Sequence, residues 1–335
     1  MHIRDTALRG RRSLVAAALG LAAGAWLATG AARAQEGYPN RPLTLVVPFA
    51  AGNVTDSVAR LIGERLARSL GQAVVVENRP GASGGVGMTA IGRAAPDGYT
   101  IGLSSIGPLS LNPALYSKLA YDPAAGFTIL SVVYRGPYLV LVDAASPYMT
   151  LKDLVQASRA SSRGLDFASP GAGSMQHLTG EIFARASGGN FTHVPNKGSG
   201  QAASLLLGKH VPVLFEVTGV AVPFVRSGQM RALGISSAER LSSLPNVPTI
   251  AESGYPNMTT EGWLCMVAPA GLPVPLRQRL GEEIRRIMGS AEMRAKVTDM
   301  AGFAETMTPE QSALFVREET VRWGEIVRAA GVKLD

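Results

Sequence analysis

The feature that most constrains the fold of this chain is a repeated alternation of short apolar runs with amphipathic stretches. Leu43 to Val47 is an almost continuous apolar run, which is typical of a strand buried in a parallel sheet. From Thr55 to Leu70 the apolar residues recur at helical spacing, and Gly71 stands where a helix is expected to end. Further elements are expected as a strand at 73–77, a helix that follows the glycine-rich stretch 81–87 and ends near residue 94, and a strand at 100–104. This order predicts a right-handed parallel sheet with helices on both faces.

The same alternation returns after Tyr138 and is followed by helices toward the C-terminus. Thr150 and Asp153 have the spacing of a capping box, so a helix is expected to begin there. Strands are expected at residues 139–142, 165–168, 191–194, 211–216 and 231–235, and helices at 174–186, 275–288, 291–300 and 309–329. Because about 300 residues exceed what one hydrophobic core usually supports, the two α/β units predict two lobes that face one another.

The first 34 residues have the layout of a secretory signal. A basic start, Arg4 to Arg12, precedes the apolar run Leu14–Gly30, and Ala32-Arg33-Ala34 places small residues before a new N-terminus at Gln35. A transmembrane anchor is the alternative, but the run is short for a span of ~20 residues. We therefore expect residues 1–34 to be a cleavable signal peptide and the protein to be periplasmic. The paired arginines before the run do not decide between the Sec and twin-arginine routes.

Charge and cysteine content exclude several classes of function. The chain has 32 Lys+Arg and 25 Asp+Glu, and removing the five arginines and one aspartate of residues 1–34 leaves 27 against 24, a net charge of +3. With no remaining basic cluster, nucleic-acid binding is not expected. Cys265 is the only cysteine, which excludes an internal disulfide and a cysteine-based zinc site. Its apolar neighbours indicate a buried structural thiol. None of the histidines has a partner at metal-ligand spacing, so no metal is expected.

Three turns that follow predicted strands combine glycines with hydroxyl side chains. They lie at residues 48–56, 104–107 and 169–174. In open parallel sheets, ligands bind beyond the carboxyl ends of the strands, and free N–H groups at helix starts form an anion site. Each turn taken alone is better explained as an ordinary tight turn that caps a helix, but three of them over both lobes favour a binding cleft. The glycines of residues 81–87 match neither nucleotide-binding pattern.

Enzyme signatures are weak in this sequence. Ser174 and His177 share one helical face and could in principle form a nucleophile and a base, but no G-x-S-x-G string is present. Glu216 ends an apolar strand, where an unpaired carboxylate would be costly. We expect Glu216 to be either a cleft residue that meets a donor or a capping group.

Several strings along the chain resemble the Bug-type receptors, the substrate-binding proteins of tripartite tricarboxylate transporters. The most specific are E-N-R-P-G-A at residues 77–82 and A-P-D-G-Y-T at residues 95–100. Further matching strings lie at residues 38–49, 112–116, 193–198, 244–249 and 268–271. Because these strings follow one another over the whole chain after residue 34, it is identified as a member of this family.

The resemblance implies a type II periplasmic binding-protein fold, with two α/β lobes joined by two crossing segments and a ligand cleft between them. Lobe 1 is expected to comprise residues 35–136 and 259–335, and lobe 2 residues 137–258. The implied function is capture of a small carboxylate (a dicarboxylate, a tricarboxylate, an aromatic acid or an acidic amino acid) for membrane permease subunits. No catalytic activity and no cofactor are implied, and a monomer is expected. A ligand sensor that docks to a signalling protein, or an enzyme on the same scaffold, is the alternative.

Carried over by position, the resemblance places ligand contacts on small residues, backbone amides and ordered water. In lobe 1 they fall on Phe49, Ala50, Ala51, Gly52, Asn53, Thr55, Ser104 and Ser105. In lobe 2 they fall on Ser169, Gly173, Ser174, Met175, Lys197 and Gly198, with Glu216 beside them. Lys197 is the only cation expected nearby.

The chain departs from the family pattern at three positions. Asn53 stands where a second glycine is usual; asparagine tolerates the left-handed conformation but adds a side chain that could touch the ligand. Asn196 replaces an aromatic residue, and Glu216 stands where many relatives have aspartate. These departures put the identity of the ligand in question and leave the expected fold unchanged.

Overall fold

The computed structural model describes residues 37–256 and 258–334. The described residues from Leu43 onward form one compact unit. The expected signal peptide, residues 1–34, and the new N-terminus at Gln35 lie outside the described residues. No helix of the described part is both long and apolar enough to span a membrane.

The first lobe is built on a sheet whose parallel part has three strands. β1 (Leu43–Val47) lies between β2 (Val74–Asn78) and β3 (Thr100–Ser105), parallel to both. β9 (Glu261–Pro269) then pairs antiparallel with β3, and β4 (Phe127–Asp143) pairs antiparallel with β9. The parallel sheet expected from the strands near 43–47, 73–77 and 100–104 is confirmed for β1, β2 and β3. Two strands that were not predicted, β9 and the first half of β4, extend this sheet in the antiparallel direction.

The second lobe uses the other half of β4. Residues 138–143 of this strand pair antiparallel with β7 (Val213–Val217) on one side and β8 (Met230–Ile235) on the other. β5 (Leu165–Ser169) and β6 (Phe191–Pro195) continue the sheet, with β5 parallel to both β6 and β7. The strand order is β2-β1-β3-β9-β4-β7-β5-β6, with β10 (Phe303–Ala304) and β8 on β4.

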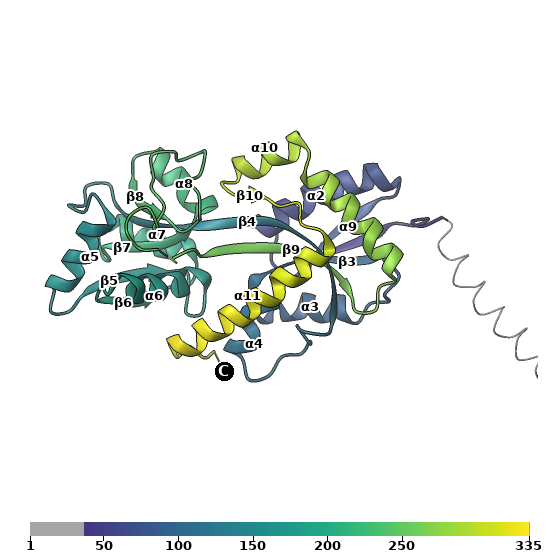
Figure 1. The fold of residues 1–335 in the computed structure, drawn as a ribbon, viewed down its shortest axis with the longest axis horizontal. Helices are drawn as coiled ribbons and strands as arrows, with labels where there is room; N and C mark the ends of the chain where they lie inside the picture. The colour runs from purple at the N-terminus through teal and green to yellow at the C-terminus, as the bar shows by residue number, and fades with distance from the viewer. Residues whose placement is uncertain (1–36, 257, 335) are drawn as a thin grey trace, which may run out of the picture. The chain divides into compact units, whose positions relative to one another are not determined.

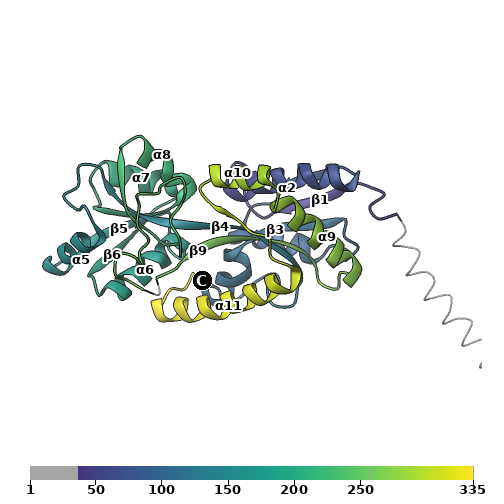
Figure 2. The same ribbon diagram turned by 45° about the horizontal axis from the view of Figure 1, so that its top comes forward.

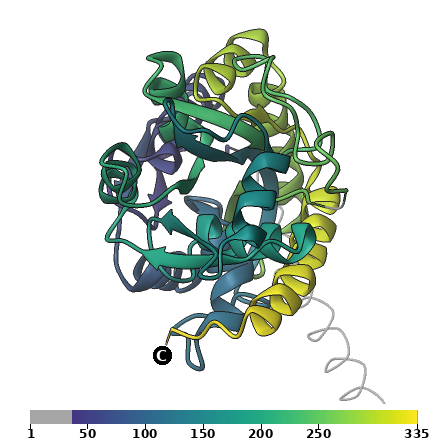
Figure 3. The same cartoon turned by 90° about the vertical axis from the view of Figure 1, so that its left-hand side faces the viewer.

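Alternating side chains of β4 direct helices to both faces of the second lobe. Leu139 and Leu141 belong to one hydrophobic cluster, with α7 (Ser199–Leu207) and α8 (Thr218–Arg226). Val140 and Val142 belong to another, with α5 (Leu151–Ala160) and α6 (Met175–Ser187). Because successive side chains of a strand point to opposite faces, one strand anchors both layers. In Figure 3 the second lobe faces the viewer.

The other helices lie with the first lobe or run between the lobes. They are α2 (Val54–Leu70), α3 (Gly85–Gly92), α4 (Asn112–Leu115), α9 (Val274–Met288), α10 (Ala291–Asp299) and α11 (Pro309–Ala330), with the short turns η1 (Ala82–Gly84) and η2 (Gly107–Leu111, a π-helix). β4 and β9 run side by side from one lobe to the other, and α11 runs beside the first lobe toward α6 (Figures 1 and 2). Two α/β lobes joined by crossing segments confirm the expected fold class. The lobe bounds at 136/137 and 258/259 remain a prediction.

Local signals account for where several elements begin and end. Gly71 ends α2 in the left-handed conformation (φ 67°), and Thr150 with Asp153 forms the expected capping box of α5. Gly87 is needed where α3 crosses the end of β1, because a Cβ atom there would lie 2.6 Å from Pro48 Cα. Cys265 is buried in β9, which confirms the expectation of a structural thiol.

Candidate functional site

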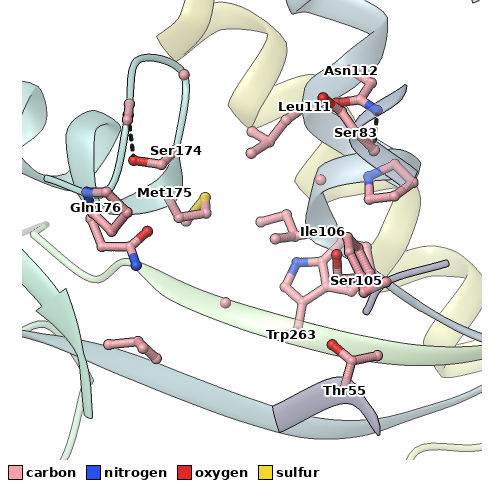
Figure 4. Close-up of a pocket in the computed structure, with 18 of the residues that line it drawn as sticks. Thr55, Ser83, Ser105, Ile106, Leu111, Asn112, Ser174, Met175, Gln176 and Trp263 are labelled. Atoms are coloured by element: carbon pink, nitrogen blue, oxygen red, sulfur yellow. Dashed lines mark hydrogen bonds between the residues drawn. The ribbon is translucent and has the colours of Figure 1, made fainter. Parts of the chain in front are cut away.

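A cavity of about 500 Å³ lies between the lobes and is lined by both. Its walls come from the first turn of α2, from η2 and α4, from the loop 170–174 with the first turn of α6, and from β4 and β9. Figure 4 shows Ser174, Met175 and Gln176 on one side of the cavity, and Ile106 and Trp263 on the other. The cavity therefore lies where the carboxyl ends of β1, β3 and β5 lead into helices.

On the first lobe, the loop before α2 holds the start of that helix open toward the cavity. Asn53 is the N-cap: its side-chain oxygen accepts a hydrogen bond from the Asp56 amide at 2.9 Å. The Asp56 carboxylate in turn accepts from the Gly52 amide and from Asn78. The N–H groups of Val54 and Thr55 have no partner among the described residues, and both residues line the cavity.

Asp56 stabilises this loop as a charged group. Burial alone would raise its pKa, but hydrogen bonds from Arg60, Gly52 and Asn78 together lower the pKa below the ordinary value of 3.8. The carboxylate is therefore ionised at neutral pH and bridges the loop, α2 and β2. It does not line the cavity.

On the second lobe, the start of α6 is arranged in the same way. Ser174 is the N-cap: its Oγ accepts from the His177 amide and donates to the Gly171 carbonyl at 2.7 Å. The Gly173 amide is occupied, because it donates to Nδ1 of His177. The N–H groups of Met175 and Gln176 have no partner among the described residues, and both residues line the cavity.

The rest of the lining is apolar or neutral. None of the described residues that line the cavity carries a charged side chain. Ile106, Leu111 and Trp263 form apolar surface between the two helix starts. The Tyr134 hydroxyl is buried there without a partner among the described residues, and burial raises its pKa, so it stays a proton donor. Helix N-termini stabilise negative charge through their N–H groups and dipoles. This arrangement can hold one small ligand that has an apolar middle and an anionic group at each end.

Six of the expected ligand contacts line this cavity. They are Phe49, Thr55, Ser105, Gly173, Ser174 and Met175. The remaining nine do not line it: Ala50, Ala51, Gly52, Asn53, Ser104, Ser169, Lys197, Gly198 and Glu216. Whether any of the fifteen contacts a ligand remains a prediction.

The positions outside the lining have identifiable other roles. Ser104 points to the opposite face of β3 from Ser105 and is fully buried. Ser169 is bonded to His193, with 2.7 Å between Oγ and Nε2. Asn53 is extended (φ −88°) and does not adopt the left-handed conformation that asparagine tolerates; the residue of its loop with a positive φ is Gly52 (φ 88°). The side chain is used for helix capping.

Several lining residues were not predicted from the sequence. Tyr134 and Trp263 come from strands that sequence periodicity did not identify as part of the cavity, and Leu334 comes from the C-terminal end of the chain. Leu334 donates its amide to the Leu115 carbonyl at 3.0 Å, which places Leu334 beside α4. The apolar strings around Trp263 were visible, but nothing local linked them to the cavity. Asn112 belongs to one of the strings that resemble the family, and its side chain donates to the Ser83 carbonyl at 3.1 Å, which links α4 to η1.

Ser174 and His177 do not form a nucleophile and base. The Ser174 hydroxyl meets the main-chain amide of His177, and the ring Nδ1 accepts from Gly173. The His177 and His193 rings stack with centroids 3.7 Å apart, just behind the 169–174 loop. Among residues 37–256 and 258–334, no group of three or more His, Cys, Asp or Glu side chains could hold a metal ion.

The stacked histidines predict acid sensitivity of the fold. Burial, with a contribution from neighbouring His177, lowers the pKa of His193 to about 4 from an ordinary 6.5. As the pH falls from about 6.5 to 4, the imidazole is protonated in the unfolded chain before it is protonated in the folded chain. The free energy of unfolding therefore decreases in that range, and this group causes no further decrease below pH 4. We expect His193→Gln to flatten the decrease of the urea midpoint between pH 6.5 and 4. An unchanged slope would contradict this, and His210→Gln, whose ring lies outside the cluster, is the matched control.

Known proteins resemble this chain over most of its length. Residues 58–332 match the family described as "Tripartite tricarboxylate transporter family receptor". The structure is similar to that of the periplasmic binding protein BugD (33% identity, TM-score 0.74), covering 89% of this chain and 100% of that one. It is similar to MatC from Rhodopseudomonas palustris with bound malate (33%, 0.73, covering 87% and 100%). It is also similar to Rpa4515 from R. palustris with adipate (32%, 0.79, covering 89% and 100%).

Proposed function

Because this chain belongs to the tripartite tricarboxylate transporter receptor family, whose members are solute-binding receptors, we propose that it captures a small carboxylate in the periplasm and delivers it to the permease subunits of such a transporter. Membership of this family favours a role in transport over a role in signalling. An enzyme on the same scaffold is disfavoured, because this is a receptor family and Ser174 and His177 do not meet as a nucleophile and base.

The observation that carries the carboxylate assignment is the pair of helix starts that face one cavity. α2 offers the N–H groups of Val54 and Thr55, and α6 offers those of Met175 and Gln176. Four unpaired donors on two walls, with apolar surface between them, suit a ligand with a carboxylate at each end. The malate of MatC and the adipate of Rpa4515 are dicarboxylates, which supports this assignment.

A ligand screen tests the proposal. Native mass spectrometry of freshly purified protein is expected to show a co-purified organic anion. A thermal-shift screen covers mono-, di- and tricarboxylates, aromatic acids and acidic amino acids. The acid that binds is expected to raise the melting temperature, because at a hundredfold excess over Kd it adds roughly 2.7 kcal/mol to the free energy of unfolding. Stabilisation only by sugars, metals or cationic amino acids would overturn the carboxylate assignment.

Export is proposed from the sequence of residues 1–34. The protein recovered from a periplasmic extract is expected to begin at Gln35, because Ala32-Arg33-Ala34 precedes it. Edman sequencing or intact-mass measurement reads the N-terminus directly. A membrane-bound protein that retains Met1 would contradict cleavage.

Lys197 gives a prediction that separates an amide-based grip from an ion pair. Its side chain is exposed and does not line the cavity, and its amide donates to Gln201. Because an exposed charge acts weakly across solvent, we expect Lys197→Ala to change Kd for the identified carboxylate by less than about threefold. Calorimetry that shows loss of binding in this variant would mean that an ion pair holds the ligand.

A further inference from the structure

One polar side chain in the cavity wall is oriented by a buried carboxyl group behind it. Gln176 extends its amide toward the cavity (Figure 4), and its Nε2 donates to Oε1 of Glu216 at 2.9 Å. Glu216 does not line the cavity; it lies in β7 directly before Val217, which does line it. The amide orientation of Gln176 is therefore set from outside the cavity.

Glu216 is an unusual group to find in this position. Its side chain is almost fully buried, with 1% of the residue exposed, and it forms no ion pair with any described residue. Oε1 accepts from Gln176 and from the Val217 amide at 2.8 Å, whereas Oε2 is buried without a hydrogen-bond partner among the described residues. Burial raises the pKa of Glu216, although Gln176, Val217 and the nearby Ser199 oppose this shift. A buried carboxyl group held this way costs stability.

The Val217 amide decides which end of the Gln176 amide meets Glu216. This main-chain N–H lies in a partly buried position and donates to Oε1 of Glu216 at 2.8 Å. A proton on Glu216, if present, then belongs on Oε2, and Oε1 remains an acceptor in both protonation states. Oε1 therefore binds the NH₂ end of Gln176. The carbonyl Oε1 of Gln176 has no partner among the described residues and is left as an acceptor.

An acceptor at this point has a chemical consequence for the ligand. The main-chain N–H groups of Met175 and Gln176 form a donor pair at the same wall, so a carboxylate bound there lies close to the Gln176 side chain. A plain methylene group next to that carboxylate would leave the Gln176 oxygen unpaired, whereas a hydroxyl or ammonium group would donate to it. Sites built to bond a ligand donor discriminate against analogues that lack it.

We propose, on the basis of the proposed function, that Gln176 is a specificity-determining residue and that Glu216 is its positioning residue. Together they select carboxylates that carry a hydroxyl or ammonium donor beside the carboxylate held by α6. The preferred ligands are thus hydroxy or amino diacids over the unsubstituted diacids of the same length.

Matched ligand sets test this proposal by calorimetry. The sets are succinate, malate and aspartate for four carbons, and glutarate, 2-hydroxyglutarate and glutamate for five. In the unaltered protein, the better-bound set is expected to show the hydroxy or amino acid binding roughly threefold to tenfold more tightly than the plain diacid, the value of one hydrogen bond. Malate and aspartate separate a hydroxyl from an ammonium preference.

Two variants and a control assign the preference to these residues. Gln176→Met keeps the main-chain N–H and the side-chain length but removes the acceptor. The ratio of Kd for the plain diacid to Kd for the substituted acid is therefore expected to fall to about one. Glu216→Leu frees the Gln176 amide to rotate, so the same ratio is expected to fall. The melting temperature of the free protein is measured beside it, because this variant also removes the acceptor of the Val217 amide. Gln201→Met, on an exposed position outside the cavity, is expected to leave the ratio unchanged.

Two results would overturn the proposal in distinguishable ways. Plain diacids that bind as tightly as the substituted ones, or a preference that survives Gln176→Met, would show that the Gln176 oxygen does not select the ligand, with carboxylate binding intact. Failure of every acid in both sets to bind the unaltered protein, while another class of solute does bind, would overturn the carboxylate assignment itself.

Discussion

Replacing Val54 or Met175 with proline is expected to weaken carboxylate binding by roughly tenfold to a hundredfold while leaving the fold intact. Each residue is the first of its helix and contributes an unpaired N–H to the cavity. Proline lacks that N–H, and a hydrogen bond to a charged group is worth about 1.5–3 kcal/mol. The loss is read as the change in Kd for the carboxylate that the screen identifies.

Proline fits both positions, so the loss of a donor can be separated from misfolding. Proline is favoured at the first position of a helix, and the residue before it must be extended. Asn53 (ψ 175°) and Ser174 (ψ 156°) already are.

The same change at α10 provides the matched control. Ala291→Pro alters the first position of a helix that follows an extended N-cap, Ser290, and that does not line the cavity. It is expected to leave Kd unchanged. Val54→Ala and Met175→Ala control for the lost side chains while keeping the N–H groups. If both proline variants bind as the unaltered protein does, main-chain donors do not hold the carboxylate.

Glu319→Leu is expected to lower the free energy of unfolding by about 3–5 kcal/mol. Oε2 of Glu319 accepts from two buried indoles, Trp263 Nε1 at 3.1 Å and Trp323 Nε1 at 2.8 Å, and Oε1 pairs with Arg322 at 3.0 Å. Leucine would leave two buried N–H donors unpaired, each costing about 1–3 kcal/mol. Because Trp263 lines the cavity, this carboxylate on α11 also supports the wall of the site.

Urea denaturation at pH 7 measures this effect. Glu319→Gln keeps an oxygen that can accept from both indoles, so its loss is expected to be smaller than that of Glu319→Leu. Glu318→Gln, on the exposed neighbouring position, is expected to stay within about 0.5 kcal/mol of the unaltered protein. Equal stability of the Glu319→Leu and Glu319→Gln variants would mean that the indole hydrogen bonds contribute little.

Most elements of this fold could be predicted because their signals are local. The apolar run at 43–47 became β1, the helical spacing at 55–70 became α2, and Thr150 with Asp153 became a capping box. Capping and amphipathic spacing act within a turn or two of the chain, so they can be read without knowing the partners of a segment. The family strings added the two-lobed architecture.

β9 and the first half of β4 could not be predicted in the same way. Trp263 in β9 pairs with Arg135 in β4, more than a hundred residues away, and the direction of the pairing depends on the path of the intervening lobe. An apolar run alone does not distinguish a parallel from an antiparallel strand, or a strand from a buried helix. The mixed sheet was therefore visible only once the chain was folded.

The candidate site divides along the same line. By itself, the sequence determined that helices begin near residues 54 and 175 after small, polar turns, because N-capping depends on a few neighbouring residues. Tertiary structure decided which groups face the cavity: Ser105 lines it and Ser104 does not. It also brought Trp263 and Leu334 to the wall and left the Lys197 side chain outside it. The physical reason is that a cavity forms where segments far apart in the sequence pack together. The free energy of that packing depends on both segments, so it cannot be inferred from the local sequence of either one.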